Sequence, residues 1–247
     1  MRISSQEQNP IILVPSFRST SDDEACYDTI VNALNDRRTV LDAALGRLTS
    51  QATALTDVAM RLVETLRGGH KVLVAGNGGS AAESQHFAAE LVGRFKRDRT
   101  PYAVLSLTTD TAILTAIAND YGYQEVFARQ VLAFGQAGDM LLTFSTSGES
   151  ENLLRAARAG RERQMIVIAI TGELPNSLET LSDITLRVPL ADTALVQELH
   201  MIVTHILCDI VETHLSLSEK PSVGTDVSRS QSEQTLWQVS EQDEWRI

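Results

Sequence analysis

The chain has 247 residues, of which 43% are hydrophobic and 21% are charged, and its formal net charge is −11. This length is enough for one sizeable hydrophobic core, and the composition is that of a soluble globular protein. The negative charge argues against a general nucleic-acid-binding protein, because no basic surface is evident that would neutralise phosphates. Cys26 and Cys208 have no metal-ligand spacing, and two lone cysteines fit a reducing cytosol better than a disulfide framework.

Residues 1–21 are rich in Ser, Gln, Asn and Pro without helical periodicity, and we interpret them as an N-terminal arm. The apolar run at residues 10–15 is bracketed by prolines and is far too short to cross a membrane. The arm either docks on a neighbouring subunit or forms a loosely ordered extension. We therefore expect a cytoplasmic protein with no membrane association.

A pair of helices is predicted after the arm. Ser21-Asp22 is a candidate N-cap, and apolar residues recur at near-helical spacing over residues 30–48. A second apolar face covers residues 55–66, and Gly68-Gly69 closes this helix as a natural C-cap.

After Gly69, short apolar runs alternate with helical segments. Buried runs of this length, separated by amphipathic helices, predict a parallel sheet covered on both faces. The predicted fold is therefore α/β: a three-layer αβα sandwich with a five-stranded parallel sheet, preceded by the helical pair. The predicted strands are Val72–Ala75, Ala103–Leu107, Met140–Phe144, Ile166–Ile170 and Ile184–Val188.

The last predicted helix, at about residues 193–215, is apolar on more than one stripe, which indicates burial against its own sheet and another subunit. From Ser216 the composition becomes polar and charged, so we assign residues 22–215 to the domain and residues 216–247 to a solvated tail. Trp237 and Trp245 lie in this tail. They are either a docking element for a protein partner or incidental aromatics in a disordered segment.

The first predicted strand runs directly into Gly76-Asn77-Gly78-Gly79-Ser80, and a helix is expected to begin at about Ser80. Glycines allow tight turns and close approach of a ligand to backbone N–H groups, and a helix N-terminus attracts anions. The segment is neither a GxGxxG nor a GxxxxGK[ST] motif. A plain strand-to-helix turn is the alternative interpretation.

The third predicted strand ends in the same way, at Ser145-Thr146-Ser147-Gly148-Glu149-Ser150. Hydroxyl groups can donate to phosphate oxygens without a net positive charge, although such a cluster is more often an N-cap. Both loops follow strands of one parallel sheet, so they converge where open α/β folds bind ligands. Together they predict a phosphate-ester site.

Five blocks of sequence stand in the order found in phosphoheptose isomerases, which belong to the SIS (sugar isomerase) domain superfamily. The chain resembles this family over about residues 45–215. The blocks are Gly76-Asn77-Gly78-Gly79-Ser80, His86-Phe87-Ala88-Ala89-Glu90-Leu91, Asn119-Asp120-Tyr121-Gly122, Ser145-Thr146-Ser147-Gly148 and Gln197-Glu198-Leu199-His200.

The resemblance implies a homotetramer with active sites between subunits, and interconversion of sedoheptulose 7-phosphate and D-glycero-D-manno-heptose 7-phosphate. This step begins the synthesis of nucleotide-activated heptose. By the same resemblance, Glu90 and His205 are the catalytic acid–base pair, and zinc is held by His86, Glu90, Gln197 and His205. The candidate substrate-binding residues are Asn77, Gly78, Gly79, Ser80, Arg94, Asn119, Asp120, Ser145, Thr146, Ser147, Ser150 and Gln197.

The chemistry of an aldose–ketose isomerase is compatible with these residue types. Proton transfer between two carbons needs a base for the carbon acid and an acid for the carbonyl oxygen, which Glu90 and His205 can supply. His86 and Glu90 are four residues apart, and Gln197 and His205 are eight apart, so each pair lies on one side of a helix. A surface helix pair and a buried core histidine are the alternatives from spacing alone.

Three other functions remain open. A non-catalytic scaffold resembling the DnaA-binding replication-initiation factor has the same fold, but that factor does not keep the glutamate that corresponds to Glu90. A sugar-phosphate-sensing regulatory domain usually carries a helix-turn-helix domain, for which the N-terminal extension is too short. An isomerase of another phosphosugar is possible on fold alone.

Overall fold

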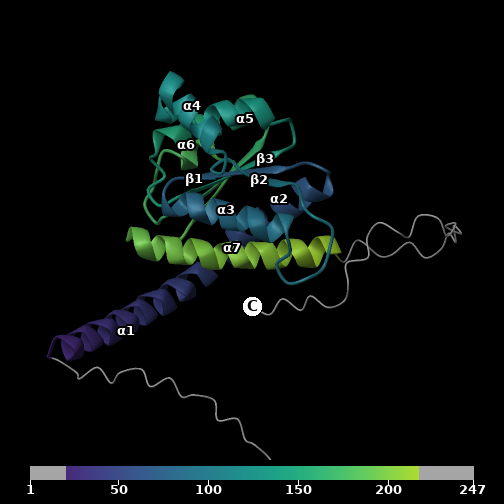
Figure 1. Cartoon of the computed structure of the whole chain (residues 1–247). Coiled ribbons are helices and arrows are strands. Elements are labelled where there is room, and N and C mark those ends of the chain that lie inside the picture. The colour runs from purple at the N-terminus through teal and green to yellow at the C-terminus, as the bar shows by residue number, and fades with distance from the viewer. Residues whose placement is uncertain (1–20, 217–247) are drawn as a thin grey trace, which may run out of the picture.

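The computed structural model describes residues 21–216 (Figure 1). The predicted arm, except Ser21, and the predicted tail with Trp237 and Trp245, except Ser216, lie outside the described residues. The domain boundaries inferred from composition therefore stay predictions. The elements are α1 Ser21–Thr49, α2 Ala52–Arg67, β1 Val72–Gly76, α3 Gly79–Val92, β2 Val104–Ser106, α4 Thr111–Tyr121, η1 Tyr123–Glu125, α5 Ala128–Phe134, β3 Met140–Ser145, α6 Glu151–Glu162, β4 Ile166–Thr171, η2 Glu179–Leu181, β5 Ile184–Arg187 and α7 Thr193–Ser216.

The five strands form one parallel sheet in the order β2-β1-β3-β4-β5. Each strand matches the apolar run predicted for it to within one residue at either end, and the predicted αβα sandwich is confirmed. The chain adds β2 on one side of β1 and then continues with β3 on the other side. The sheet therefore has its topological switch point between β1 and β3, which is where open α/β sheets bind ligands.

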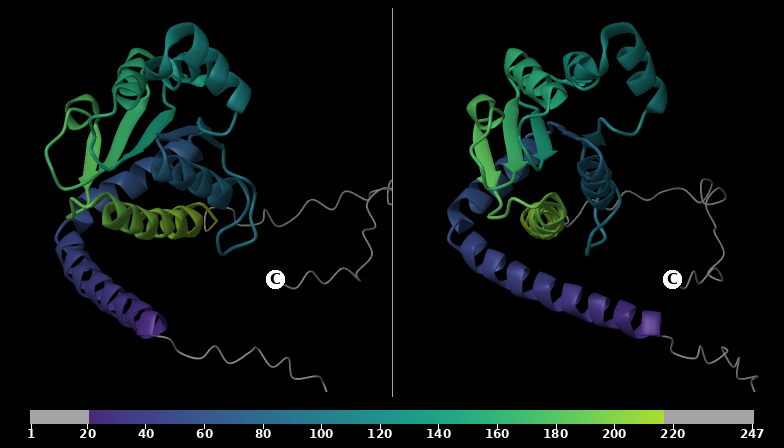
Figure 2. Two further views of the ribbon diagram at one scale, coloured as in Figure 1. Left: turned by 60° about the vertical axis from the view of Figure 1, so that its left-hand side comes forward. Right: turned by 90° about the vertical axis from the view of Figure 1, so that its left-hand side faces the viewer.

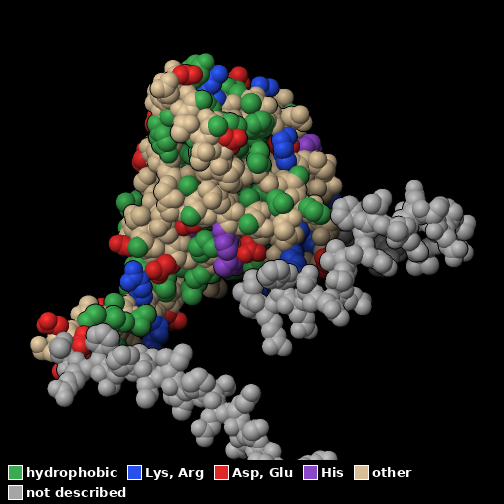
Figure 3. Space-filling model, in the orientation of Figure 1, with side chains coloured by type: hydrophobic (Ala, Val, Ile, Leu, Met, Phe, Trp, Pro, Cys, Tyr) green, Lys and Arg blue, Asp and Glu red, His purple; other side chains and the backbone are tan. Residues whose placement is uncertain are grey.

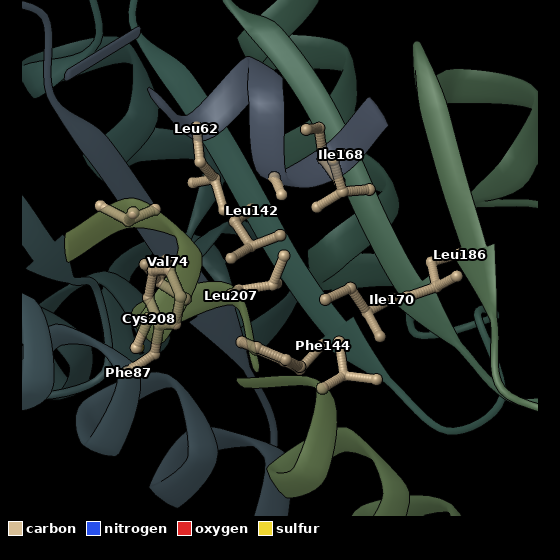
Figure 4. Close-up of a cluster of buried hydrophobic side chains, with 14 of the residues drawn as sticks. Leu62, Val74, Phe87, Leu142, Phe144, Ile168, Ile170, Leu186, Leu207 and Cys208 are labelled. Atoms are coloured by element: carbon tan, nitrogen blue, oxygen red, sulfur yellow. The ribbon is translucent and has the colours of Figure 1, made fainter. Parts of the chain in front are cut away.

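Alternate residues of the strands face the two helical layers. Val72 and Val74 pack with α2, α3 and α7, whereas Leu73 and Ala75 pack with α5 and α6. Figures 1 and 2 show these two layers on opposite sides of the sheet. Figure 4 shows the first of them, where Leu207 of α7 approaches Leu142 of β3. Burial on both faces explains why the central strands β1, β3 and β4 are mostly apolar rather than alternating.

Helix α1 is helical from Ser21, the first described residue, so its predicted N-cap is not tested, and only its C-terminal end packs firmly on the domain. Ala44 and Leu48 are buried there. The N-terminal part projects away from the body (Figures 1 and 2). It leaves Tyr27, Ile30 and Leu34 at 67%, 53% and 63% exposure, so α1 carries an apolar surface that the rest of residues 21–216 does not cover.

Among the described residues, α7 is the one helix long and apolar enough to cross a membrane. It lies against α2 and α3 in this structure (Figure 1). Val196, Val203 and Leu207 are fully buried in that contact. Packing within the domain therefore accounts for its apolar character.

Candidate active site

The two predicted anion-binding loops lie side by side at the switch point, because β1 and β3 are neighbours and both loops follow their carboxyl ends. The first loop leads from β1 into α3 and the second leads from β3 into α6. The two helix N-termini thus face one crevice, where the positive ends of their dipoles favour an anion.

The first loop requires its glycines. Gly78 has φ +56°, and a Cβ at Gly76 would lie 2.3 Å from the backbone oxygen of Ser80. A Cβ at Gly79 would lie 2.4 Å from Nε2 of Gln197, a residue of α7. Gly78 is also the N-cap of α3 and provides no side-chain cap. The loop therefore brings bare backbone close to α7, which goes beyond what a plain strand-to-helix turn needs.

The second loop is held in shape by its own hydroxyl groups. Ser145 Oγ accepts a hydrogen bond from the Gly148 N–H at 3.0 Å, and Ser147 Oγ accepts one from the Glu149 N–H at 3.2 Å. Gly148 has φ +66°, where a side chain would be strained. Ser150, the N-cap of α6, makes no capping hydrogen bond. Capping thus does not use up the Ser150 hydroxyl.

A reciprocal amide pair joins the two loops. Asn77 Nδ2 donates to Asn152 Oδ1 at 2.9 Å, and Asn152 Nδ2 donates to Asn77 Oδ1 at 2.8 Å. The Tyr123 hydroxyl donates to the same Asn77 oxygen at 3.2 Å. Asn152 lies in the first turn of α6 and is 4% exposed. We did not identify Asn152 or Tyr123 from the sequence, because their partner is distant along the chain.

The two loops and the start of α7 enclose a cleft of about 250 Å³. Most of the predicted substrate-binding residues line it, so the structure brings together residues predicted from three separate blocks of sequence. Its lining also includes Thr193, which the sequence did not indicate and which begins α7. The predicted residues that line the cleft are Asn77, Gly78, Gly79, Ser80, Ser145, Thr146, Ser147, Ser150 and Gln197.

Three predicted substrate-binding residues are not among those that line this cleft. Asn119 and Asp120 are exposed at the C-terminal end of α4, where the Asn119 side chain donates to Asp120. Arg94 is exposed in the segment after α3. Their role in binding stays a prediction.

A second group of polar side chains lies where α3 and α7 run side by side. His86 Nε2 is 3.1 Å from Glu90 Oε1 and 3.0 Å from His205 Nε2. His86 and Glu90 are 40% and 21% exposed, so the group opens to solvent. Figure 3 shows histidine and acidic side chains together on this part of the surface. The predicted face-sharing of His86 and Glu90 is therefore present, and α7 adds His205 to it.

This group adjoins the phosphate-loop cleft. A neighbouring hollow of about 470 Å³ is lined by His86 and shares Gly79 and Gln197 with the cleft. A ligand with an anionic group at one end could therefore extend from the loops towards His86. Gln197 stands at the junction.

The donor set of this group fits a zinc ion. Ligand atoms of His86, Glu90 and His205 all lie within 4.8 Å of one another. Zinc–nitrogen and zinc–oxygen bonds of about 2.0–2.2 Å place neighbouring ligand atoms roughly 3.3 Å apart in a tetrahedral site. The distances of 3.1 and 3.0 Å from His86 Nε2 are close to that value. Two imidazole nitrogens that face each other also require a proton or a cation between them.

A buried pair supports the same two helices behind the surface group. His200 of α7 is fully buried, and its Nδ1 lies 3.4 Å from Glu83 Oε2 of α3. Cys208, also on α7, is a free thiol within the core. Burial, followed by the charges of Glu90 and Glu212, raises the pKa of Cys208 to about 12. Cys208 is therefore a neutral packing residue and not a nucleophile.

A parallel α/β sheet with two anion-binding loops at its switch point is the architecture of a sugar-isomerase domain, and the SIS domain profile matches residues 38–172. The phosphoheptose isomerase of Roseiflexus sp. (strain RS-1) is 48% identical over 175 residues, which cover 71% of this chain and 89% of that one. The phosphoheptose isomerase of Pelobacter propionicus is 45% identical over 188 residues, covering 76% and 98%. A phosphoheptose isomerase structure from Neisseria gonorrhoeae matches with a TM-score of 0.69 at 38% identity, covering 76% and 99%. The chain belongs to the phosphoheptose isomerase family.

Proposed function

We propose that this protein interconverts sedoheptulose 7-phosphate and D-glycero-D-manno-heptose 7-phosphate, the first step towards nucleotide-activated heptose. The main support for the proposal is that the cleft between the two loops adjoins the group of His86, Glu90 and His205 in one chain. The cleft formed by the phosphate loops continues, past Gly79 and Gln197, into the hollow that His86 lines. The family relationship gives the substrate class, since relatives that match most of their length are phosphoheptose isomerases.

The loops suit the phosphate end of such a substrate. Backbone N–H groups at the starts of α3 and α6, with the hydroxyls of Ser80, Ser147 and Ser150, offer donors to phosphate oxygens without requiring a cluster of lysines or arginines. This explains how a chain with a net charge of −11 can bind a phosphorylated sugar. Binding at the loops leaves the other end of the sugar free to reach the His86, Glu90 and His205 group.

The reaction needs two proton transfers, and two side chains of the group can perform them. Glu90 removes the proton from C1 of the ketose while His205 protonates the carbonyl oxygen on C2, which gives a 1,2-enediol. The proton of the C1 hydroxyl then passes to His205, and Glu90 returns its proton to C2. The net change moves one hydrogen from C1 to C2 and one from the C1 oxygen to the C2 oxygen, and it leaves both side chains as they began.

The proposal includes a zinc ion held by His86, Glu90, Gln197 and His205. When bound, zinc supplies a Lewis acid that polarises the carbonyl and stabilises negative charge on the enediolate. Gln197 lines both hollows, so its side chain is placed to contact an ion and the substrate.

We further propose a cytoplasmic homotetramer with active sites at subunit contacts. The exposed apolar residues Tyr27, Ile30 and Leu34 on α1 support self-association, because they recur at helical spacing on a helix that projects from the body of the domain (Figure 1). Arg94 and Asp120 lie outside this chain's cleft. In a tetramer they could line the cleft of a neighbouring subunit. The space-filling view shows apolar side chains along α1 (Figure 3).

The scaffold alternative is not favoured. A protein that only binds a partner has no chemical need for a carboxylate and two imidazoles with ligand atoms within 4.8 Å of one another. That group keeps Glu90, which the related replication factor lacks.

Turnover of sedoheptulose 7-phosphate by the purified protein, followed by NMR with and without added zinc, tests the proposal. Arabinose 5-phosphate is the control substrate, because it carries a phosphate on a shorter sugar. We expect the heptose 7-phosphate to form from sedoheptulose 7-phosphate, with much less turnover of the pentose. A folded tetramer supplied with zinc that gives no heptose product would contradict the proposal and favour a phosphosugar-binding scaffold.

A further inference from the structure

The segment that joins α3 to β2, residues 93–103, is anchored to α7 by one buried carboxylate. Glu212 accepts hydrogen bonds from the backbone N–H groups of Phe95 at 2.9 Å, Lys96 at 2.9 Å and Arg97 at 3.1 Å. Its side chain is fully buried. Burial acts to raise the pKa of Glu212, but these N–H donors and the nearby guanidinium lower it below its ordinary value. The carboxylate is therefore charged in the folded protein at neutral pH.

Arg99 completes this anchor and extends it to α3. Its Nε lies 3.1 Å from Glu212 Oε1, and the Arg99 side chain is 1% exposed. Its other nitrogens donate to the backbone oxygens of Glu90 and Leu91, each at 2.9 Å, and of Gly93 at 3.0 Å. One buried ion pair thus fixes the end of α3, the start of the 93–103 segment and the C-terminal half of α7 relative to one another. Figure 1 shows the segment passing beside α7.

Phe95 is the side chain that this anchor directs towards the candidate active site. Its ring stacks on the ring of His205, with centroids 5.6 Å apart and an interplanar angle of 15°. His205 meets the edge of the His86 ring on another side, at 5.2 Å and 68°. The χ2 torsion of a histidine is broad and roughly two-fold, so an imidazole can rotate about it. A ring stacked on the imidazole restricts that rotation.

We propose that Phe95, held in place by the Glu212–Arg99 anchor, is a positioning residue that fixes the ring of His205 for proton transfer. The inference rests on the proposed function of His205. It assigns Phe95 no contact with the reacting atoms. The backbone N–H of Phe95 donates a hydrogen bond to Glu212, and Arg99 donates one to the backbone oxygen of Glu90. The Glu212–Arg99 pair therefore sets the position of the Phe95 ring and of the Glu90 backbone together.

The test compares Phe95→Leu with Phe95→Tyr, which keeps the ring, and with Arg97→Ala as a matched control. Arg97 lies in the same segment, but its side chain is 43% exposed, and its polar partners within residues 21–216 are Asp209 and Thr213 of α7. Two readouts are taken on each full-length variant. The first is kcat and KM for sedoheptulose 7-phosphate, and the second is the NMR signals of the His205 ring protons.

An aromatic pair contributes about 0.5–1.5 kcal/mol. At about 1.4 kcal/mol per factor of ten, we expect Phe95→Leu to lower kcat by about two- to tenfold and to leave KM unchanged. The His205 signals should shift downfield when the stacked ring is removed. Phe95→Tyr and Arg97→Ala should match the parent in both readouts.

Unshifted His205 signals in Phe95→Leu would overturn the inference, and so would an unchanged kcat in that variant. An equal loss of kcat in Arg97→Ala would also overturn it, because the effect would then come from the segment rather than from the ring. If the parent protein did not turn over the substrate, the proposed function would fail. The NMR shifts would still decide whether Phe95 sets the position of His205.

Discussion

The amide pair between the two phosphate loops gives the sharpest quantitative prediction. Replacing Asn152 with alanine removes hydrogen bonds of 2.8 and 2.9 Å from a site that is 4% exposed. Each such hydrogen bond contributes about 0.5–1.5 kcal/mol to the free energy of unfolding. Asn77 is only partly buried and keeps the Tyr123 hydroxyl, so it is not left wholly unsatisfied. We therefore expect a loss of about 1–2 kcal/mol in the free energy of unfolding.

The same change should weaken phosphate binding. If the loops must be brought back together by the ligand, the affinity falls by up to the same free energy, which is roughly five- to thirtyfold. The assays are thermal unfolding at a fixed protein concentration and calorimetric titration with inorganic phosphate. For a chain of this size, about 1–2 kcal/mol corresponds to a fall in Tm of about 2–8 °C.

Arg158→Ala is the control for Asn152→Ala. Arg158 lies on the same helix and is 54% exposed, and its ion pair within the described part of the chain is a 3.5 Å contact with Glu151. Surface pairs of this kind contribute about 0–1 kcal/mol, and this one lies away from the amide pair. A Tm and a phosphate affinity of Asn152→Ala that equal those of the control would refute the idea that the amide pair holds the two loops together.

Three further predictions concern the catalytic group, the buried anchor and the assembly. Glu90→Gln and His205→Ala should each reduce turnover to background. Their elution volumes on gel filtration should stay those of the parent. A variant that remains active would show that the replaced side chain does not have its proposed role. Because the pKa of Glu212 is lowered in the folded state from its ordinary value of 4.5, its charged form stabilises the fold above pH 4.5, and this stabilisation is lost as pH falls through the folded-state pKa. Urea unfolding between pH 7 and pH 3 should therefore show a weaker pH dependence in Glu212→Gln than in the parent, and parallel curves would contradict this account. Leu34→Lys, at a position 63% exposed in the single chain, should shift light-scattering mass towards smaller species with little change in helix content, and an unchanged mass would place the subunit contact elsewhere.

Local patterns predicted the framework of this protein. The apolar runs predict all five strands, and the signal is strongest for the central strands β1, β3 and β4, which are buried on both faces and need no knowledge of their neighbours. Both phosphate loops were predictable for a similar reason, since glycines and hydroxyls mark a strand-to-helix turn within a few residues. The spacing of His86 and Glu90 placed them on one face of α3, and the structure has them 3.1 Å apart.

Contacts between distant elements could not be predicted in this way. Asn77 and Asn152 are 75 residues apart, and Arg99 and Glu212 are 113 apart. No local pattern records which residue of one element will face which residue of another, because the packing of α7 on α3 sets that pairing. The contacts of Arg94 and Asp120 are harder still to predict from local sequence, because we propose that a neighbouring subunit makes them.

In the proposed reaction, Glu90 moves a proton between C1 and C2 of a heptose phosphate. The most direct measurement is the reaction of sedoheptulose 7-phosphate in D₂O, with NMR used to read the hydrogen isotope at C2 of the aldose product. A carboxylate that takes the C1 proton and exchanges with solvent puts deuterium at C2, and Glu90→Gln should give neither product nor deuterium. Product formed at the parent rate by Glu90→Gln would contradict the account, whereas retained hydrogen at C2 with an inactive Glu90→Gln would mean that Glu90 returns the same proton before it exchanges with solvent.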